Sequence, residues 1–484
     1  MTEKLKFPTD KLFITNEWVD GTGGVLALTN PSDGSHLANI ACGTSADVDR
    51  AVGAARRAAD GSWGAMPAFE RGRVLAVMGR LVLEHVDELA AMEADDVGKP
   101  LTQARNDVIA LARYLEFYGG AADKLHGETI PYLDGYTVYT LREPHGVTGH
   151  IVPWNYPMQI IGRSVGAALA TGNACVMKPA EEACLTALAF AEIARRAGLP
   201  EGALNVVPGL GEEAGAALAG HSDIDHVSFT GSVPVGEAVQ IAAARNVRPV
   251  TLELGGKSPQ LVFEDADLEA ALPFLVNAGI QNAGQTCSAA SRILVHRSLL
   301  DEVTERMGVA YGDLTVGPAR QDYRIGPLVS HRQQKIVAGY IQQAQAAGLQ
   351  IAGQGQFVDH LPEGGAYVLP TLLAHVPADH ALAREEVFGP VQAIIAFDDE
   401  DEAVAIANST DYGLVAGAWT ENGSRQMRLA KRLKAGQVFI NNYGAGGGVE
   451  LPFGGVKKSG HGREKGFEAL YSFTQVKTVA VKHD

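Results

Sequence analysis

The segment VTGHIVPWNYP, residues 147–157, opens the part of the chain whose pattern decides the fold. Its first six residues are typical of a short strand, and a turn with Pro and Asn follows them. The same alternation of strand and helix then recurs. Strands are expected at residues 147–152, 174–178, 204–207, 225–229 and 250–254, and helices near 158–171, 183–197, 211–220 and 234–245. Such repeats predict an α/β fold with an open parallel sheet covered by helices on both faces.

A second α/β region comes after the first along the chain. Its expected strands are residues 259–263, 291–295, 392–397, 414–419 and 437–440, and its expected helices lie near 298–311, 331–347, 400–409 and 423–435. Upstream, residues 47–118 have a helical composition that is interrupted at 61–64 and 98–100. We expect these helices to cover a sheet, and residues 1–45, with strand-like segments at 11–19 and 25–29, to form an irregular edge.

Residues 127–144 change character. Alternating Tyr, Thr, Val and Leu residues flank the pair Asp134-Gly135, which is a strong signal for a β-hairpin turn. Residues 468–481 alternate in the same way. We expect the two segments to form one small sheet. A hairpin with few local partners is also free to pair with another subunit.

The composition excludes several classes of protein. The chain has 484 residues, a formal charge of −16 and a pI near 5.4, so no basic surface is evident for a nucleic-acid partner. Its four cysteines, Cys42, Cys175, Cys184 and Cys287, form no CxxC pair, which argues against a zinc site or a disulfide framework. Neither a signal-peptide-like apolar start nor a membrane-spanning run is present. We therefore expect a cytoplasmic protein of about two or three domains, without a metal or a membrane partner.

The segment QNAGQTCSAA, residues 281–290, contains the candidate nucleophile, Cys287. Its small neighbours leave room for a substrate to approach the sulfur, and nearby peptide N–H groups can stabilise an anion. The alternative is a small buried hydrophobic residue, which is the commonest role of a free cysteine. Residues elsewhere in the chain bear on this choice.

Several short motifs occur in order along nearly the whole chain. They are PWNYP (153–157), KPAE (178–181), FTGSVPVG (229–236), LELGGKSP (252–259), GQTC (284–287), EEVFGP (385–390) and PFGG (452–455). Together they resemble the aldehyde dehydrogenase superfamily, in its NAD-dependent, non-acylating branch. The resemblance implies a homodimer or homotetramer that oxidises an aldehyde to its carboxylic acid. The domains that it implies are an NAD-binding domain (1–122 and 145–251), a catalytic domain (252–457) and an oligomerisation element (123–144 and 468–484).

The resemblance also implies four catalytic residues. Cys287 would attack the aldehyde as a thiolate to form a thiohemiacetal and later a thioester. Asn155 would bind the oxyanion together with the Cys287 N–H, although a turn residue is the alternative. Glu253 would be the general base, because its apolar neighbours are expected to raise its pKa. Glu464 matches a second family carboxylate with a role in proton relay, and a charge at a helix N-terminus is the alternative.

A further set of positions matches the family's cofactor site. A glutamate at the position of Glu181 would bind both ribose hydroxyls and repel a 2′-phosphate, so we expect NAD over NADP. Gly231 and Ser232 open an expected helix whose N-terminus would meet the pyrophosphate. The segment GLGEEAG, residues 209–215, is interpreted as a turn and helix start near the adenine, because a lone G-x-G pattern is weak evidence. The full set is Trp154, Lys178, Glu181, Gly231, Ser232, Gly236, Leu254, Glu386 and Phe388.

The substrate pocket implied by the resemblance has aromatic walls, which suit an aromatic or medium-chain aldehyde. The glycine-rich residues 444–448 (GAGGG) imply a roomy pocket. Arg163 occupies a position where semialdehyde dehydrogenases bind a substrate carboxylate, and the second position of their arginine pair is Gln281 here. A carboxylated semialdehyde is therefore the alternative substrate, although Arg163 can equally pair with a surface acid. The expected pocket residues are Tyr156, Ile160, Arg163, Tyr443 and Phe453.

Two other classes of function fit the sequence less well. A catalytically silent relative should have lost Cys287, Asn155 or Glu253, and all three are present. A cysteine hydrolase that works without a cofactor has no Ser/Cys-His-Asp pattern to support it.

Overall fold

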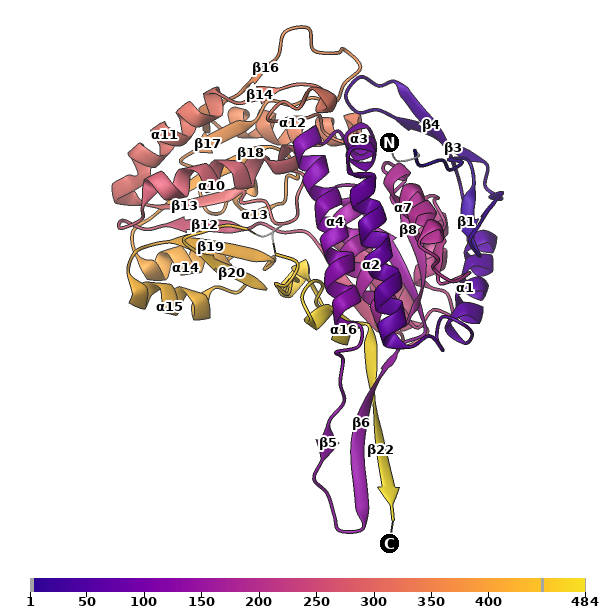
Figure 1. Ribbon diagram of the computed structural model, residues 1–484. Helices are drawn as coiled ribbons and strands as arrows, with labels where there is room; N and C mark the ends of the chain where they lie inside the picture. Colours follow the sequence, from indigo (N-terminus) through magenta and orange to yellow (C-terminus); the bar gives the residue numbers. More distant parts are fainter. Residues whose placement is uncertain (1–3, 445–447, 484) are drawn as a thin grey trace.

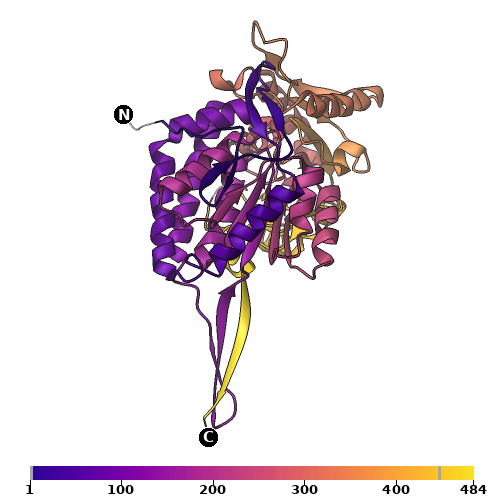
Figure 2. The same cartoon turned by 90° about the vertical axis from the view of Figure 1, so that its right-hand side faces the viewer.

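The computed structural model describes residues 4–444 and 448–483 of the chain. Figure 1 shows two lobes side by side and a narrow stalk that projects from one of them and carries the C-terminus at its tip. In the turned view of Figure 2 the stalk again stands clear of the body. Residues 445–447 of the glycine-rich loop lie outside the described residues.

The first lobe is built on an eight-stranded sheet with the order β2-β1-β9-β8-β7-β10-β11-β21. The strands from β9 to β11 run parallel to one another and are buried on both faces, which confirms the predicted open parallel sheet. The strands are β1 (Leu12–Ile14), β2 (Glu17–Val19), β7 (Val147–Val152), β8 (Ala174–Pro179), β9 (Leu204–Val206), β10 (His226–Thr230), β11 (Val250–Glu253) and β21 (Gly460–His461).

The N-terminal segment lies at the sheet edge as expected, but residues 11–19 are not one strand. Strands β1 and β2 form a tight hairpin in which Leu12 lies opposite Val19. Between them Thr15 and Asn16 have φ values of 54° and 58°. Asn tolerates this left-handed conformation better than most residues, so the chain reverses here without a glycine to signal the turn. Beside this edge β3 (Val25–Thr29) pairs with β4 (His36–Ala41).

Long helices cover one face of the first sheet, and Figure 1 shows α2 and α4 side by side in front of it. The predicted interruptions at 61–64 and 98–100 are confirmed, since α1, α3 and α4 end or begin there. An additional boundary falls at His85, where neither Gly nor Pro marks it. The helices of this part of the chain are α1 (Ser45–Ala59), α2 (Ala68–Glu84), α3 (Val86–Val97) and α4 (Leu101–Ala121). Helices α2, α3 and α4 pack against one another, whereas α1 lies apart from them and packs on β8 and β9. The other helices of this lobe include α7 (Leu185–Arg196), α8 (Ala216–Ala219) and α9 (Val233–Ala244).

The helix expected at residues 158–171 is not regular. It consists of α5 (Pro157–Ile160), a π-helical turn over Ile161–Val165 and α6 (Gly166–Thr171). Single π-turns inside helices are rare and occur often at functional sites. Arg163 lies in the middle of this one.

The second lobe contains a seven-stranded sheet with the order β15-β17-β18-β13-β12-β19-β20, parallel except for β15. All five predicted strands are present. The additional strands β15 and β17 are short, and β15 bends at an irregularity between Ile351 and Gly353, so its pattern was weak. The strands are β12 (Pro259–Val262), β13 (Arg292–His296), β15 (Gln350–Gln354), β17 (Thr371–Ala374), β18 (Val391–Phe397), β19 (Val415–Trp419) and β20 (Gln437–Ile440). Its longer helices are α10 (Leu268–Ile280), α11 (Leu300–Gly312), α12 (His331–Ala346), α14 (Glu400–Asn408) and α15 (Gly423–Arg432).

The stalk is the small sheet predicted from residues 127–144 and the C-terminal tail. Strand β6 (Tyr136–Pro144) pairs antiparallel with β22 (Thr474–Lys482) on one side and with β5 (Thr129–Ile130) on the other. The tail is not a strand throughout, because α16 (Glu468–Ser472) is helical and buries Ala469 and Leu470 in the first lobe. Several large apolar side chains of the stalk are exposed: Ile130, Tyr132, Leu133, Leu141, Val476 and Val481.

The helices within residues 4–444 and 448–483 do not have a membrane-spanning character. None of them combines the length and the apolar composition needed to cross a membrane.

Candidate active site

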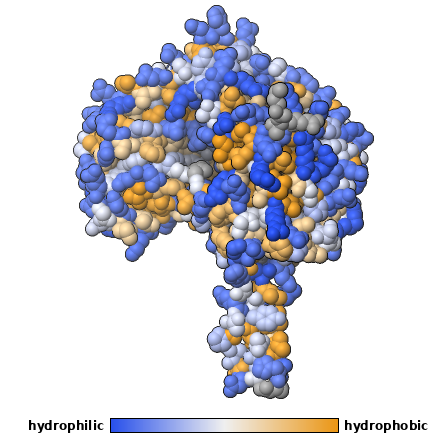
Figure 3. Space-filling model, in the orientation of Figure 1, coloured by the Kyte–Doolittle hydropathy of each residue, from blue (hydrophilic) through white to orange (hydrophobic). Residues whose placement is uncertain are grey.

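Three of the four predicted catalytic residues converge between the two lobes, and the fourth, Glu464, does not line their cavity. Asn155 follows β7, Glu253 ends β11, and Cys287 lies in the loop between α10 and β13. The first two positions are carboxyl ends of parallel strands, where ligands bind in such sheets. All three side chains line one cavity of about 370 Å³, which we call the inner cavity. Figure 3 shows the surface hollowed between the lobes.

The loop that carries Cys287 has an unusual backbone. Asn282, Ala283 and Gly284 have φ values of 50°, 53° and 72° in succession. The left-handed conformation costs a residue with a side chain about 1–2 kcal/mol, so other contacts must hold it. The Asn282 amide donates to the Asn155 carbonyl at 2.9 Å, and the Gln285 amide donates to the Asn282 carbonyl at 3.0 Å. The amides of this loop therefore have a structural role that composition alone did not reveal.

Asn155 is positioned by the same loop. Its Nδ2 donates to the Gln285 carbonyl at 3.0 Å, and the side chain is buried. An amide has two N–H groups, and no described residue accepts the second one. The side chain is therefore held with one donor left for a ligand in the inner cavity, which the alternative role of a simple turn residue does not explain.

Cys287 differs from the other cysteines of the chain. Cys42, Cys175 and Cys184 are buried, whereas Cys287 is half-buried at the cavity. Burial raises the pKa of the Cys287 thiol to about 12, although the nearby Arg163 guanidinium opposes this shift. The thiol is therefore protonated at neutral pH and needs a base before it can attack.

Glu253 is suited to be that base. Its side chain is 1% exposed, and neither carboxyl oxygen has a hydrogen-bond partner among the described residues. Burial and the neighbouring Glu464 raise the pKa of Glu253 well above its ordinary value. Such a carboxyl holds and releases a proton at a higher pH than a surface carboxylate. The expected raised pKa and the expected burial are both found, so a solvent-facing carboxylate is excluded.

Glu464 and Arg163 form a buried ion pair. Glu464 Oε1 also accepts from the Ser228 hydroxyl at 3.2 Å, and the Arg163 guanidinium lies 4.9 Å from the centre of the Phe453 ring. The partner of Arg163 is therefore a buried acid and not the surface acid considered from the sequence. Glu464 also lies before α16, in a bridge to Phe453, so the helix N-terminal role is wrong for it.

Five of the predicted cofactor residues line the inner cavity. The rings of Trp154 and Phe388 meet edge to face, with their centres 5.4 Å apart. The Gly256 N–H donates to Glu386 at 2.9 Å, and burial raises the pKa of Glu386 to about 7. A side chain on Gly255 would collide with the Glu386 carboxyl, so only glycine permits this close approach. The five residues are Trp154, Gly231, Ser232, Glu386 and Phe388.

The other predicted cofactor residues lie outside the inner cavity. Lys178 donates to Glu181 at 2.9 Å at the carboxyl end of β8. Burial raises the pKa of Glu181, but Lys178 outweighs burial and the net shift is downward, so this carboxyl is ionised. Leu254 packs against Gly236, where an added Cβ would lie 2.6 Å from the leucine side chain. These two residues therefore bring α9 close to β11 and do not face the cavity.

A second cavity of about 520 Å³ lies beyond Cys287, and we call it the outer cavity. Tyr156, Gln159, Gln281, Thr286 and Ser288 line both cavities and mark where they meet. Among the predicted pocket residues, Ile160, Arg163 and Phe453 line the inner cavity, Tyr443 lines the outer one and Tyr156 lines both.

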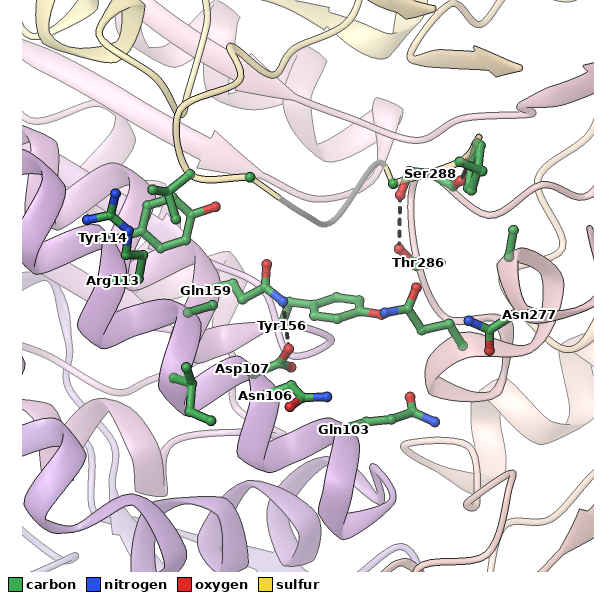
Figure 4. Close-up of a pocket in the computed structure, with 18 of the residues that line it drawn as sticks. Gln103, Asn106, Asp107, Arg113, Tyr114, Tyr156, Gln159, Asn277, Thr286 and Ser288 are labelled. Carbon is green, nitrogen blue, oxygen red and sulfur yellow. Dashed lines mark hydrogen bonds between the residues drawn. The ribbon is translucent and has the colours of Figure 1, made fainter. Parts of the chain in front are cut away.

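Most residues of the outer cavity were not predicted. Figure 4 shows Gln103, Asn106 and Arg113 on α4 and Asn277 on the opposite wall, with the Tyr156 ring between them. On a helix, polar residues spaced three or four apart normally indicate a solvent-facing surface. Nothing in the local pattern indicated that this surface of α4 faces a cavity.

Comparison with known proteins agrees with the geometry. The model of the aldehyde dehydrogenase family matches residues 18–479. A mitochondrial benzaldehyde dehydrogenase of Antirrhinum majus is 43% identical over 475 residues, which are 97% of this chain and 88% of that protein. An NAD+ complex of an aldehyde dehydrogenase from Bacillus cereus is 41% identical with a TM-score of 0.95, covering 99% of this chain and 98% of that one. A Burkholderia cenocepacia crystal structure described as an aldehyde dehydrogenase is 63% identical with a TM-score of 0.97, covering 98% and 100%. The chain therefore belongs to the aldehyde dehydrogenase family.

Proposed function

We propose that the protein oxidises an aldehyde to its carboxylic acid with NAD as the electron acceptor. One observation carries the proposal. Cys287, Asn155 and Glu253 line a single cavity together with the candidate cofactor residues. A nucleophile, an anion-binding amide and a base in one cavity form the set of groups that acyl chemistry on a thiol requires.

Cys287 supplies the nucleophile in the proposed mechanism. Because its thiol is protonated at neutral pH, Glu253 first accepts the proton through one of its two unpaired oxygens. The sulfur then forms a bond to the aldehyde carbon, and the carbonyl oxygen becomes an anion. The free N–H of Asn155 stabilises that anion, and one donor of this kind contributes about 10²–10³-fold to the rate.

NAD, when bound, accepts a hydride from the substrate carbon and so provides the oxidation. The thioester on Cys287 that results must be hydrolysed. Glu253 first releases the proton of the thiol to solvent and then takes a proton from water, which attacks the thioester carbon. The carboxylic acid leaves, and the departing sulfur takes up the proton from Glu253 to restore the thiol. The same carboxyl therefore handles a proton in both halves of the reaction.

The residues of the inner cavity fit a dinucleotide. Ser232 precedes the N-terminus of α9, whose first turn contains no acidic side chain, so the positive end of the helix dipole is available to a pyrophosphate. Trp154 and Phe388 also line the cavity and offer ring surfaces there. Glu181 is held as a carboxylate by Lys178 and would accept from ribose hydroxyls, so we propose a preference for NAD over NADP.

The body of the substrate is proposed to be aromatic or of medium chain length. Tyr156, Ile160 and Phe453 surround the approach to Cys287 and offer an apolar wall. The semialdehyde alternative needs Arg163 to bind a substrate carboxylate, but Glu464 already holds that guanidinium in a buried pair. We therefore do not propose a semialdehyde substrate.

A test of the proposed function follows NADH absorbance with benzaldehyde, hexanal and succinic semialdehyde, each with NAD and with NADP. We expect NADH with the first two aldehydes and a lower rate with NADP. Cys287→Ala should abolish the signal, and Cys42→Ala, which removes a buried thiol outside both cavities, should keep it. A Cys287→Ala protein that still reduced NAD would overturn the mechanism.

We also propose that the stalk joins protomers into a homodimer or homotetramer. Its exposed apolar side chains and the free edges of its sheet favour pairing with a second copy. A cytoplasmic location is proposed from the free cysteines, all of which are unpaired in the structure. Light scattering of the purified protein, and of a variant shortened before β22, tests the role of the stalk.

A further inference from the structure

Five side-chain amides line the outer cavity, among apolar and charged residues. We call Gln103, Asn106, Gln159, Asn277 and Gln281 the amide cluster. They come from different elements, since the first two lie on α4, Gln159 on α5, Asn277 on α10 and Gln281 just after α10. Figure 4 shows the labelled members around the Tyr156 ring. Their convergence on one space is therefore a property of the fold and not of one helix surface.

Two members of the cluster are held in place and still have hydrogen-bonding groups to spare. Gln103 accepts from the Asn282 N–H at 2.9 Å, which leaves its NH2 group unused by described residues. Gln159 donates to Asp107 at 2.6 Å, which leaves its carbonyl oxygen unused. One of these groups is a donor and the other is an acceptor.

The remaining members add to this capacity. Asn277 accepts from Arg324 at 2.9 Å and keeps its NH2 group. No side-chain hydrogen bond joins Asn106 or Gln281 to another described residue, although both line the cavity. An amide donates and accepts, so the wall can satisfy a group such as a hydroxyl in either direction.

The charges at this wall are already neutralised. Arg113 donates to Glu450 at 2.6 Å at the cavity, and Asp107 is paired with the buried Lys99. An anionic or a cationic substrate group would therefore meet side chains whose charge a neighbour already balances. A neutral group that forms hydrogen bonds needs no unbalanced charge.

The apolar wall beside Cys287 and the amide cluster farther out favour a substrate that is apolar near the aldehyde and polar at its far end. We infer that the preferred substrate is an uncharged aldehyde with an apolar or aromatic body and a hydrogen-bonding group, such as a hydroxyl, at the end far from the aldehyde. The inference rests on the proposed function and names its substrate class. The apolar part lies along Tyr156 and Phe453, and the polar end meets the amide cluster.

The test compares kcat/KM for matched para-substituted benzaldehydes with NAD. The hydroxymethyl and 2-hydroxyethyl compounds represent the proposed class, and the ethyl and propyl compounds match them in size. A carboxymethyl and a trimethylammoniomethyl compound provide the anion and the cation. We expect the better hydroxylated compound to exceed its alkyl match by about tenfold, the contribution of one hydrogen bond.

The possible outcomes distinguish a failure of the inference about the substrate from a failure of the proposed function. NADH formation with all compounds, but no preference for hydroxyl over alkyl, would overturn the inference and leave the proposed function intact. A preference for the anion or the cation would also overturn it, in favour of charge recognition. No NADH with any compound would overturn the proposed function and the inference together.

Variants locate the preference in the cluster. Asn106→Leu and Gln281→Leu should each lower the ratio of kcat/KM between the hydroxylated compound and its alkyl match by several-fold within the same variant, since leucine fills the space without hydrogen bonds. The matched control is Gln345→Leu, an exposed amide on α12 that lines neither cavity, and it should leave the ratio unchanged. Full preference in both cluster variants would place the recognition elsewhere and contradict the inference.

Discussion

Two buried clusters of this molecule have the same composition, one cation and two carboxyls, and differ in how completely they are paired. In the first cluster Lys99 is fully buried and donates to Glu93 at 2.6 Å and to Asp107. In the second, Arg163 pairs with Glu464, and Glu253 has no hydrogen-bond partner among the described residues.

The difference has a physical meaning. Burial raises the pKa of one carboxyl in each cluster, Glu93 and Glu253, well above its ordinary value. Glu93 is bound to Lys99 by a hydrogen bond, whereas both oxygens of Glu253 lie unbonded at the inner cavity. A paired buried charge supports the fold, and an unpaired buried carboxyl next to a nucleophile is free to move protons. The second cluster therefore contains a carboxyl with both oxygens unbonded, whereas the corresponding carboxyl of the first cluster is bound to Lys99 through one oxygen.

The largest effect is expected from Glu253→Gln. Removal of the base should lower kcat by about 10²–10⁴-fold with little loss of stability, because no hydrogen bond is broken. The matched change is Glu93→Gln, which should reduce stability and leave the chemical step alone. Steady-state kinetics and urea unfolding of both variants measure the two effects. Near-normal kcat in Glu253→Gln would show that the two clusters do not differ as described.

The next effect is on stability. Lys99→Met removes the cation from two buried carboxyls, and breaking a buried pair in this way costs about 3–5 kcal/mol. Lys124→Met breaks an exposed pair with Asp123 and should cost far less, because water already screens those two charges. Chemical denaturation measures the free energy of unfolding of both variants. Equal losses of unfolding free energy in the two variants would mean that burial does not determine how much the first cluster contributes to stability.

A third effect is on the pH dependence of the rate. The positive charge of Arg163 lowers the pKa of Glu253 and of Cys287, so Arg163→Met should raise both. A base must be deprotonated to act, so the acidic limb of the kcat–pH profile should move to higher pH. Arg163→Lys keeps the charge and should move the limb less. An unmoved limb in Arg163→Met would contradict the electrostatic link.

The smallest effect is expected from Glu464→Gln, and it has the opposite sign. Glu464 raises the pKa of Glu253, so its neutralisation should lower that pKa and move the acidic limb to lower pH. The double variant Arg163→Met/Glu464→Gln removes both charges, so its acidic limb should lie between those of the two single variants. A shift of Glu464→Gln in the same direction as Arg163→Met would indicate a structural change and not a change of charge.

The sequence predicted much of this site and could not predict the rest. The strands around Asn155 and Glu253 were found because parallel, fully buried strands have short apolar sequences bounded by turns. Cys287 was found through its small neighbours and the family motifs. The pairing of Arg163 with Glu464 was not predicted, because it joins residues far apart in the chain through a loop without a periodic pattern.

The roles of several side-chain amides were also beyond what the sequence could predict. Asn282 and Gln285 belong to the segment QNAGQTCSAA that contains Cys287, but their use in holding three left-handed residues depends on the position of Asn155. Gln103 and Asn106 resembled a solvent-facing surface of α4, because a helical period identifies a face and not the element that lies opposite it. Contacts between elements therefore decided the roles that local patterns left open.

The π-turn at Ile161–Val165 has a consequence for the spacing of the chain. An α-helix rotates by about 100° per residue, so one extra residue in a turn changes the phase between the residues before the turn and those after it. Asn155 and Tyr156 lie on one side of this phase change, and α6, packed in the first lobe, lies on the other. A substitution within the turn alters one side chain, whereas the loss of a single residue would rotate the wall of the inner cavity relative to the sheet. At this place the number of residues sets the orientation of the cavity wall, and the identity of Arg163 sets its charge.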